Sequence, residues 1–137
     1  MYPEQLVMPM KAELTSLGFE DLTTPEKVDA AIRDSKGTVL VVVNSVCGCA
    51  AGAARPAVKM AMNHEKKPTH LATVFAGFDT EATAQTRKYF APYPPSSPCM
   101  ALFKDGMLVH FIERHHIEGR SAAMIADNLR MAFDEFC

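Results

Sequence analysis

The chain has 137 residues, of which 48% are apolar and 22% are charged, and its formal charge is -2. This size and composition are typical of a single soluble globular domain with its own hydrophobic core. The small net charge offers no electrostatic footprint for nucleic acid or for an anionic membrane, so we expect neither as a partner.

Two helices are predicted in the N-terminal third. Pro3 suits a first helical turn and Gly18 suits a C-terminal stop, and apolar side chains recur between them at helical spacing. A second helix starts at Thr24-Pro25-Glu26, with a capping threonine and a proline at the first helical position, and runs to about Ser35. The apolar positions of the first helix are Leu6, Met10, Leu14 and Leu17.

The middle of the chain alternates strands and helices. Residues 38–43 are continuously apolar and mostly β-branched, which is typical of a strand buried on both faces. Residues 50–64 are rich in Ala and Met and predict a helix that Pro56 kinks. A second strand follows over residues 71–75, and Asp79 and Thr80 can cap a helix that runs to about Phe90.

The C-terminal third predicts a hairpin and a helix. Asp105-Gly106 is the strongest short hairpin signal in the chain, and it separates strands over residues 100–104 and 107–112. Ser121 caps a last helix with an apolar stripe. The proline-rich segment 91–98 is short, so we interpret it as a loop within one domain that spans residues 1–137. The stripe consists of Ile125, Leu129, Phe133 and Phe136.

This order of elements predicts an α/β fold. Strands that are separated by helices favour parallel pairing, and the late hairpin adds an antiparallel pair. We therefore expect a central mixed sheet of about four strands, helices on both faces and an extra N-terminal helical segment.

The cysteines have to be judged in the compartment where the chain works. No apolar run approaches the roughly 20 residues of a membrane span, and residues 1–5 lack the basic and apolar regions of a signal peptide. We therefore expect a cytosolic protein. Because the cytosol is reducing, its four cysteines are not assumed to form structural disulfides.

Cys47 and Cys49 lie between the buried strand and the following helix. Backbone N–H groups at a helix start favour an anion, so a cysteine there has a lowered pKa and a reactive thiolate. Gly48 allows a tight backbone between the two sulfurs. A disulfide across one intervening residue would close a strained small ring that is easily reduced, which fits a catalytic bond.

Two other interpretations of this pair remain open. The two cysteines can be small buried residues that pack a helix start. They can also be part of a metal clamp, although tetrahedral zinc needs two further ligands and no second paired-cysteine motif is present. On its strand Cys99 is expected to pack, and Cys137 is terminal with no assigned role.

The chain resembles thioredoxins in the order of its elements: a strand, a cysteine-containing turn, a kinked helix and a later Ser97-Pro98 before a hairpin. The resemblance implies a cis bond between Ser97 and Pro98 that faces the redox pair. Thioredoxins differ in having Cys-Gly-Pro-Cys, a tryptophan before the first cysteine and a buried aspartate six residues before it. This chain has Cys-Gly-Cys, Val46 and Val41 there, so efficient thioredoxin-type reduction is not expected.

The resemblance is closer to the bacilliredoxins. The matching segments cover nearly the whole chain: Asn44-Ser45-Val46-Cys47-Gly48-Cys49-Ala50-Ala51-Gly52, Arg55-Pro56, Pro95-Ser96-Ser97-Pro98, Ile112-Glu113-Arg114-His115, Ile117-Glu118-Gly119-Arg120-Ser121 and Phe133-Asp134-Glu135-Phe136-Cys137. The resemblance implies removal of bacillithiol from mixed disulfides on cytosolic client proteins. It implies that Cys47 is the nucleophile and Cys49 the resolving thiol, with no cofactor besides bacillithiol as co-substrate.

Five further residues are expected to bind substrate: Gly48, Ser97, Pro98, His115 and Arg120. The last strand should run back toward Cys47, so the loop 115–120 should lie on the active-site side, where a positive group can lower a thiol pKa or hold a carboxylate of the thiol ligand. The alternative for this loop is a polar cap of the last helix. A second function for the same pair is disulfide isomerisation or oxidation, and a third is a thiolate module that binds or carries metal.

Overall fold

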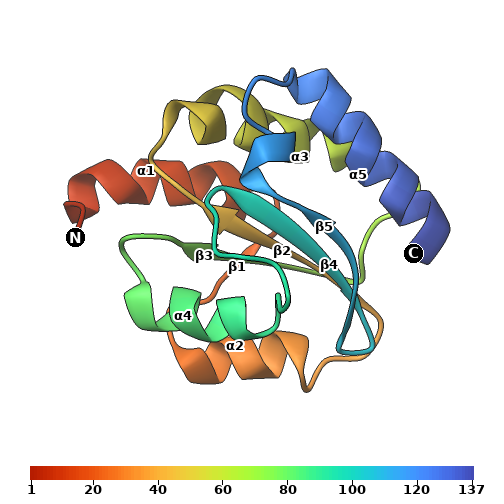
Figure 1. Ribbon diagram of the computed structural model, residues 1–137, viewed down its shortest axis with the longest axis horizontal. Helices are drawn as coiled ribbons and strands as arrows, with labels where there is room; N and C mark the ends of the chain where they lie inside the picture. Colours follow the sequence, from red (N-terminus) through yellow and green to blue (C-terminus); the bar gives the residue numbers. More distant parts are fainter.

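A single five-stranded sheet forms the centre of the computed structural model, which describes residues 1–137. Its strand order is β1-β3-β2-β4-β5, and two pairs are parallel and two antiparallel (Figure 1). The strands are β1 (Glu20–Asp21), β2 (Thr38–Asn44), β3 (His70–Phe75), β4 (Cys99–Lys104) and β5 (Met107–Ile112). The helices are α1 (Glu4–Thr15), α2 (Pro25–Ile32), α3 (Arg55–Ala61), α4 (Thr80–Lys88) and α5 (Ala122–Phe136), with a π-turn η1 (Ala50–Ala54) and a 3-10 turn η2 (Arg114–His116).

The α/β mixed sheet is confirmed, with one strand more than the four expected. The additional strand, β1, has two residues and pairs parallel with β3 at Ala72 and Thr73. So short a strand cannot display the alternation of apolar and polar residues by which a strand is recognised in sequence.

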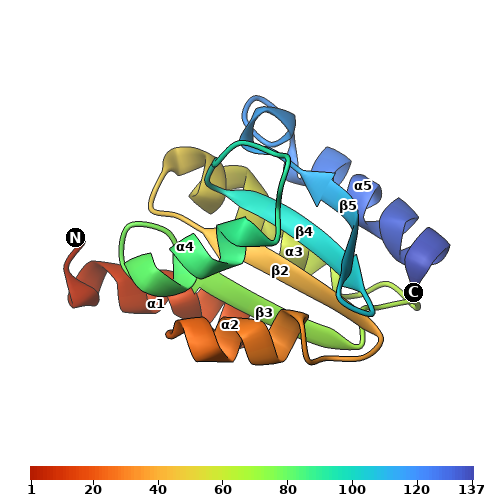
Figure 2. The same ribbon diagram turned by 60° about the horizontal axis from the view of Figure 1, so that its bottom comes forward.

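Helices cover both faces of the sheet, as expected. In Figure 1, α3 and α5 lie on one side and α2 and α4 on the other, and Figure 2 shows the latter two lying across their face. All seven residues of β2 are buried, because Leu40 and Val42 point into the core on the α3/α5 side and their neighbours point into the core on the α2/α4 side. This confirms a central strand that is covered twice. None of the helices has the length and apolar character that a membrane span requires.

The N-terminal helix confirms part of the predicted apolar stripe, since Leu14 is in the core and Leu17 packs against it. It buries Val7, Lys11 and Leu14, whereas Leu6 is 43% exposed. Lys11 is only 4% exposed, and its Nζ lies 3.0 Å from Asp21 Oδ2 and 2.6 Å from Asp79 Oδ2. Burial lowers the pKa of Lys11, but its bonds to the two carboxylates outweigh this effect, so the pKa is raised. A cation between two anions therefore attaches α1 to the rest of the fold.

The predicted element ends are mostly confirmed by their hydrogen bonds. The side chains of Thr24 and Ser121 accept from backbone N–H groups three residues later, as N-caps do. Asp105 and Gly106 both have positive φ, which is the conformation that an Asp-Gly hairpin turn uses. Asp79 is the exception, because its side chain makes no cap bond and pairs with Lys11 instead.

Candidate active site

Cys47 and Cys49 lie on the turn that leaves the end of β2. Their Sγ atoms are 2.6 Å apart, in hydrogen-bond contact, and both thiols are free and half-buried. The turn brings the two sulfurs to one end of the sheet, between its most buried strand and α3 (Figure 1).

The helix after the cysteines differs from the predicted one. Instead of one helix over residues 50–64 with a kink at Pro56, the chain forms the π-turn η1 and then starts α3 at Arg55, which places Pro56 in the first turn. A proline fits a first turn because its missing N–H would have no partner there. The N–H groups of Ala50 and Ala51 both donate to the Cys47 carbonyl, at 3.1 and 3.2 Å, and so close the turn around the first cysteine.

The two thiols have opposite pKa shifts. Partial burial raises the pKa of Cys47, but hydrogen bonds from the side chains of Cys49 and Ser45 and from the backbone of Ala50 outweigh it, so the pKa is lowered. Burial raises the pKa of Cys49, and its hydrogen bond to Cys47 and the charge there raise it further. Cys47 is therefore the thiol that ionises first, with Cys49 as its hydrogen-bond donor.

A buried arginine supports the cysteine turn from the interior of the protein. Arg55 is 3% exposed, and its Nη1 donates to Asn44 Oδ1 at 2.9 Å and to the Ser45 carbonyl at 2.8 Å. Asn44 Oδ1 also accepts from the Ser45 N–H, and Ser45 Oγ accepts from the Cys47 N–H. The sequence predicts no supporting role for Asn44, Ser45 or Arg55. The signal that could have found this role is a charged residue, Arg55, inside an alanine-rich run.

The proline before β4 lies at the same end of the sheet. The Ser97–Pro98 bond is cis, as predicted, and the bond between Ala91 and Pro92 is cis as well. Cys99, the first residue of β4, pairs with Val43 near the end of β2, which places Pro98 close to the cysteine turn. The predicted substrate-binding pair Ser97 and Pro98 thus shares this end with the sulfurs.

Gly48, between the cysteines, is not required by the backbone conformation. Its φ is not positive, and a Cβ built on it would meet no atom within 4 Å. A side chain at this position would therefore have room, and the binding role expected of Gly48 stays a prediction.

The cation that acts on the sulfurs is Arg114. Its positive charge opposes the rise in the Cys49 pKa, which burial dominates. The pKa of Arg114 is itself raised, first by its hydrogen bond to Glu118 and then by the charges of Cys49 and Cys47. The last strand does run back to the active-site end, as predicted, whereas the sequence predicts His115 and Arg120 as the binding residues of the loop that follows. His115 has a 68% exposed side chain beside Glu113, and Arg120 is also exposed. Their part in binding stays a prediction.

Three side chains of this turn form a possible metal-binding group. One ligand atom each from Glu113, His115 and His116 lies within 4.8 Å of the others. Glu113 is half-buried and both histidines are exposed, and His116 Nδ1 already accepts a hydrogen bond from the Glu113 N–H at 3.4 Å. The group flanks Arg114 and includes neither Cys47 nor Cys49.

The two remaining cysteines lie outside the site. Cys99 is fully buried in the core on the α2/α4 side, and burial raises its pKa to about 12. Cys137 is exposed beyond the end of α5, a 15-residue helix that covers about 22 Å at 1.5 Å per residue. In Figure 1 the C-terminus and the cysteine turn lie at opposite sides of the molecule.

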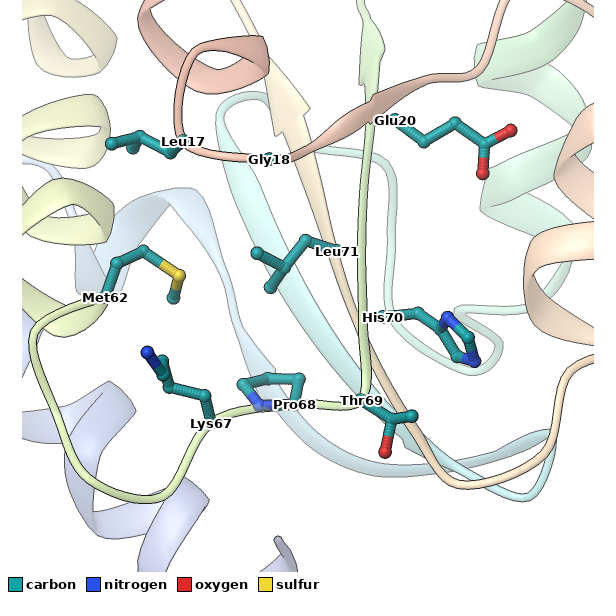
Figure 3. Close-up of a pocket in the computed structure, with 9 residues that line it drawn as sticks. All are labelled: Leu17, Gly18, Glu20, Met62, Lys67, Pro68, Thr69, His70 and Leu71. Atoms are coloured by element: carbon teal, nitrogen blue, oxygen red, sulfur yellow. The ribbon is translucent and has the colours of Figure 1, made fainter.

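A cavity of about 430 Å³ lies far from the sulfurs (Figure 3). Its wall includes Gly18, Lys67 and His70, and His70 starts β3 beside Val39, at the opposite end of the sheet from the cysteine turn. This hollow therefore takes no part in chemistry at Cys47.

The comparisons with known proteins agree with this geometry. A family model described as disulphide isomerase matches residues 2–137. A bacilliredoxin of Cytophaga hutchinsonii is 64% identical over 135 residues, covering 98% of this chain and 99% of that relative, and one of Halalkalibacterium halodurans is 55% identical over 136 residues, covering 99% and 94%. Among solved structures, a Fasciola hepatica thioredoxin matches with a TM-score of 0.61 at 21% identity, covering 87% of this chain and all of that one. The expected thioredoxin-like fold is confirmed.

Proposed function

The chain belongs to the bacilliredoxin family and is a thiol–disulfide oxidoreductase, and we propose that it removes bacillithiol from mixed disulfides on client proteins, with Cys47 attacking and Cys49 resolving. The observation that carries the assignment of roles is the pair of opposite pKa shifts, which gives one thiolate and one neighbouring thiol. Bacillithiol is proposed as the small thiol because the relatives are named bacilliredoxins.

The first step is an exchange between two sulfurs. The Cys47 thiolate attacks the bacillithiol sulfur of the mixed disulfide, a new disulfide forms between Cys47 and bacillithiol, and the client cysteine leaves as a thiolate. No net oxidation or reduction takes place, because one disulfide replaces another. The lowered pKa of Cys47 supports this step because only the thiolate attacks.

The second step releases the small thiol. The Cys49 thiolate attacks Cys47 Sγ, which forms the Cys47–Cys49 disulfide and expels bacillithiol as a thiolate. Two electrons from an external thiol must then reduce the pair. That external thiol can alternatively attack the mixed disulfide on Cys47 directly. The contact of 2.6 Å between the two Sγ atoms supports resolution by Cys49.

The decisive experiment follows the thiol itself. Reduced protein is incubated with a bacillithiolated client, the reaction is stopped with acid, and mass spectrometry locates the bacillithiol. The proposal predicts a free client and bacillithiol on Cys47 or in solution. A client that keeps its bacillithiol, while the protein still reduces a simple aromatic disulfide, would contradict the substrate and leave the oxidoreductase chemistry intact.

Disulfide isomerisation is the second candidate, and the description of the matching family model favours it. The same two thiols would then attack a disulfide within a client and let its cysteines exchange partners. Recovery of activity by a scrambled, disulfide-containing enzyme tests this function. The bacillithiol function predicts little recovery and fast removal of bacillithiol, whereas an isomerase gives the reverse order of rates.

A further inference from the structure

Arg114 lies at the same end of the sheet as the sulfurs, and the exchange chemistry described above gives it no role. It starts η2, directly after β5 returns to the active-site end. Its Nη1 donates to the Ser97 carbonyl at 3.2 Å, and its backbone N–H lies 3.4 Å from Ser96 Oγ. These contacts attach the guanidinium to the loop before β4, so its position is fixed relative to Cys47 and Cys49.

The opposite edge of the guanidinium, formed by Nε and Nη2, binds a carboxylate that can be displaced. Nε and Nη2 both donate to a single oxygen, Oε2 of Glu118, at 3.2 and 2.9 Å. The side chains of Arg114 and Glu118 are 43% and 61% exposed. An exposed pair four residues apart is worth little because water and salt compete for it, so a carboxylate from solution can replace Glu118 at small cost.

The surroundings suit a small thiol better than an extended chain. The Ser97 carbonyl, which a bound chain would use for backbone pairing, already accepts from Arg114. Arginine also binds a carboxylate through two parallel hydrogen bonds, which Nε and Nη2 can supply together.

We propose that Arg114 is the carboxylate subsite for the small thiol carried on Cys47, and that the carboxylate of this thiol displaces Glu118 from Nε and Nη2. This inference rests on the proposed function and adds the class of ligand that the site selects: small thiols that carry a carboxylate. Glu118 is the internal occupant of the subsite, which keeps the arginine paired while the site is empty of ligand.

The test uses three client peptides whose cysteine carries mercaptopropionate, mercaptoethanol or cysteamine. These adducts are similar in size and differ in charge, being anionic, neutral and cationic. The rate of release of the peptide thiol is measured for the wild type and for the Arg114→Gln and Glu118→Gln variants. Dividing the anionic rate by the neutral rate, and comparing that ratio between proteins, removes the intrinsic reactivity of each disulfide. Arg33→Gln is the control, because Arg33 forms an exposed pair with Asp34 just after the end of α2.

The proposal predicts that Arg114→Gln lowers the anionic-to-neutral ratio about fivefold, as expected for one pair of unit charges about 4 Å apart in water. The Glu118→Gln variant should raise the ratio, Arg33→Gln should leave it unchanged, and added salt should weaken the preference. The cationic adduct should respond in the opposite direction from the anionic one.

Two results would overturn the inference alone. One is an unchanged ratio in Arg114→Gln, and the other is an equal slowing of all three adducts, which would mean that Arg114 only supports the Ser97 loop. If the wild type releases none of the three peptides, the proposed function fails and the subsite fails with it.

Discussion

Arg55 and Asn44 are joined by a buried hydrogen bond of 2.9 Å that connects the two ends of the segment carrying the Cys-Gly-Cys turn. The bond links the last residue of β2 to the first residue of α3, so the segment that carries both sulfurs is fixed on either side. The same Nη1 group also donates to the Ser45 carbonyl. The position of the cysteines therefore depends on a residue that is itself almost inaccessible to solvent.

Replacing Arg55 should destabilise the protein. Arg55→Met leaves Asn44 Oδ1 and the Ser45 carbonyl without this donor in a buried place, a loss that we expect to cost about 2–4 kcal/mol of unfolding free energy. Urea denaturation measures the change. Arg33→Met is the control, and because Arg33 is 63% exposed we expect a change within about 0.5 kcal/mol. Equal denaturation midpoints for the two variants would contradict the supporting role.

The reactivity of Cys47 should rise with pH earlier than that of an ordinary thiol. Because its pKa is lowered, Cys47 is ionised at pH values where an ordinary cysteine is still protonated. The rate of its alkylation by iodoacetamide should therefore reach half its maximum at a lower pH than for an ordinary cysteine. In Ser45→Ala and in Cys49→Ala, one hydrogen bond to the Cys47 sulfur is lost, and the midpoint should move to higher pH. The Cys137→Ser background removes the exposed thiol from the measurement. A midpoint at or above the ordinary value would contradict the assigned direction.

Cys47→Ser should abolish transfer of bacillithiol from a client. A serine hydroxyl is not ionised near neutral pH, so the variant lacks the attacking thiolate. The same buffer and client with the Cys137→Ser variant serve as the control, since that residue lies at the far end of α5. Release of client thiol by the Cys47→Ser protein would show that another group attacks.

Cys49→Ala should still free the client but should accumulate bacillithiol on Cys47. The first step needs one thiolate only, whereas resolution within the chain needs the second sulfur. Intact mass spectrometry before and after addition of an external thiol measures the adduct and its removal. If Cys49→Ala fails to free the client, the first step requires both sulfurs, and an obligate dithiol or a metal clamp becomes the better interpretation.

Cys99 and Cys137 should differ sharply toward alkylation. Burial raises the pKa of Cys99 to about 12 and excludes reagent, so it should react only after unfolding. Cys137 is exposed and should react in the folded protein. Peptide mapping after a short treatment with iodoacetamide, with and without denaturant, separates the two. A disulfide that involves Cys137 in the Cys49→Ala protein should link two molecules, because the C-terminus and the turn between β2 and η1 lie at opposite sides of the molecule (Figure 1).

The parts of the fold that the sequence predicts are those that local patterns determine. The apolar residues of β2, the Asp105-Gly106 turn and the caps at Thr24 and Ser121 each have a signature within a few residues. The misassigned features depend on partners distant in the sequence. The polar side of α1 is buried at Lys11 because carboxylates at positions 21 and 79 meet it there.

The candidate site divides in the same way. The sequence predicts Cys47 and Cys49 as the site from their spacing and their place at a helix start. The direction of the Cys47 pKa agrees with that prediction, although against the effect of burial it is mainly the side chains of Cys49 and Ser45 that lower it, and the pKa of Cys49 is raised instead. The sequence predicts His115 and Arg120, and not Arg114, as binding residues, because the direction of a side chain on a turn cannot be derived from its position in the loop. Arg114 is oriented by its contact with Ser97, a residue 17 positions earlier.

The lysine between two carboxylates also sets an order on folding during synthesis. Lys11 leaves the ribosome early, but Asp79 follows it by 68 residues (79 − 11), a delay of roughly 3–14 s at about 5–20 residues per second. Until then the first helix has only one of its two anions and lacks β3, against which β1 pairs. The earliest helix to be made therefore cannot complete its docking until more than half of the chain has emerged and its charge can be buried.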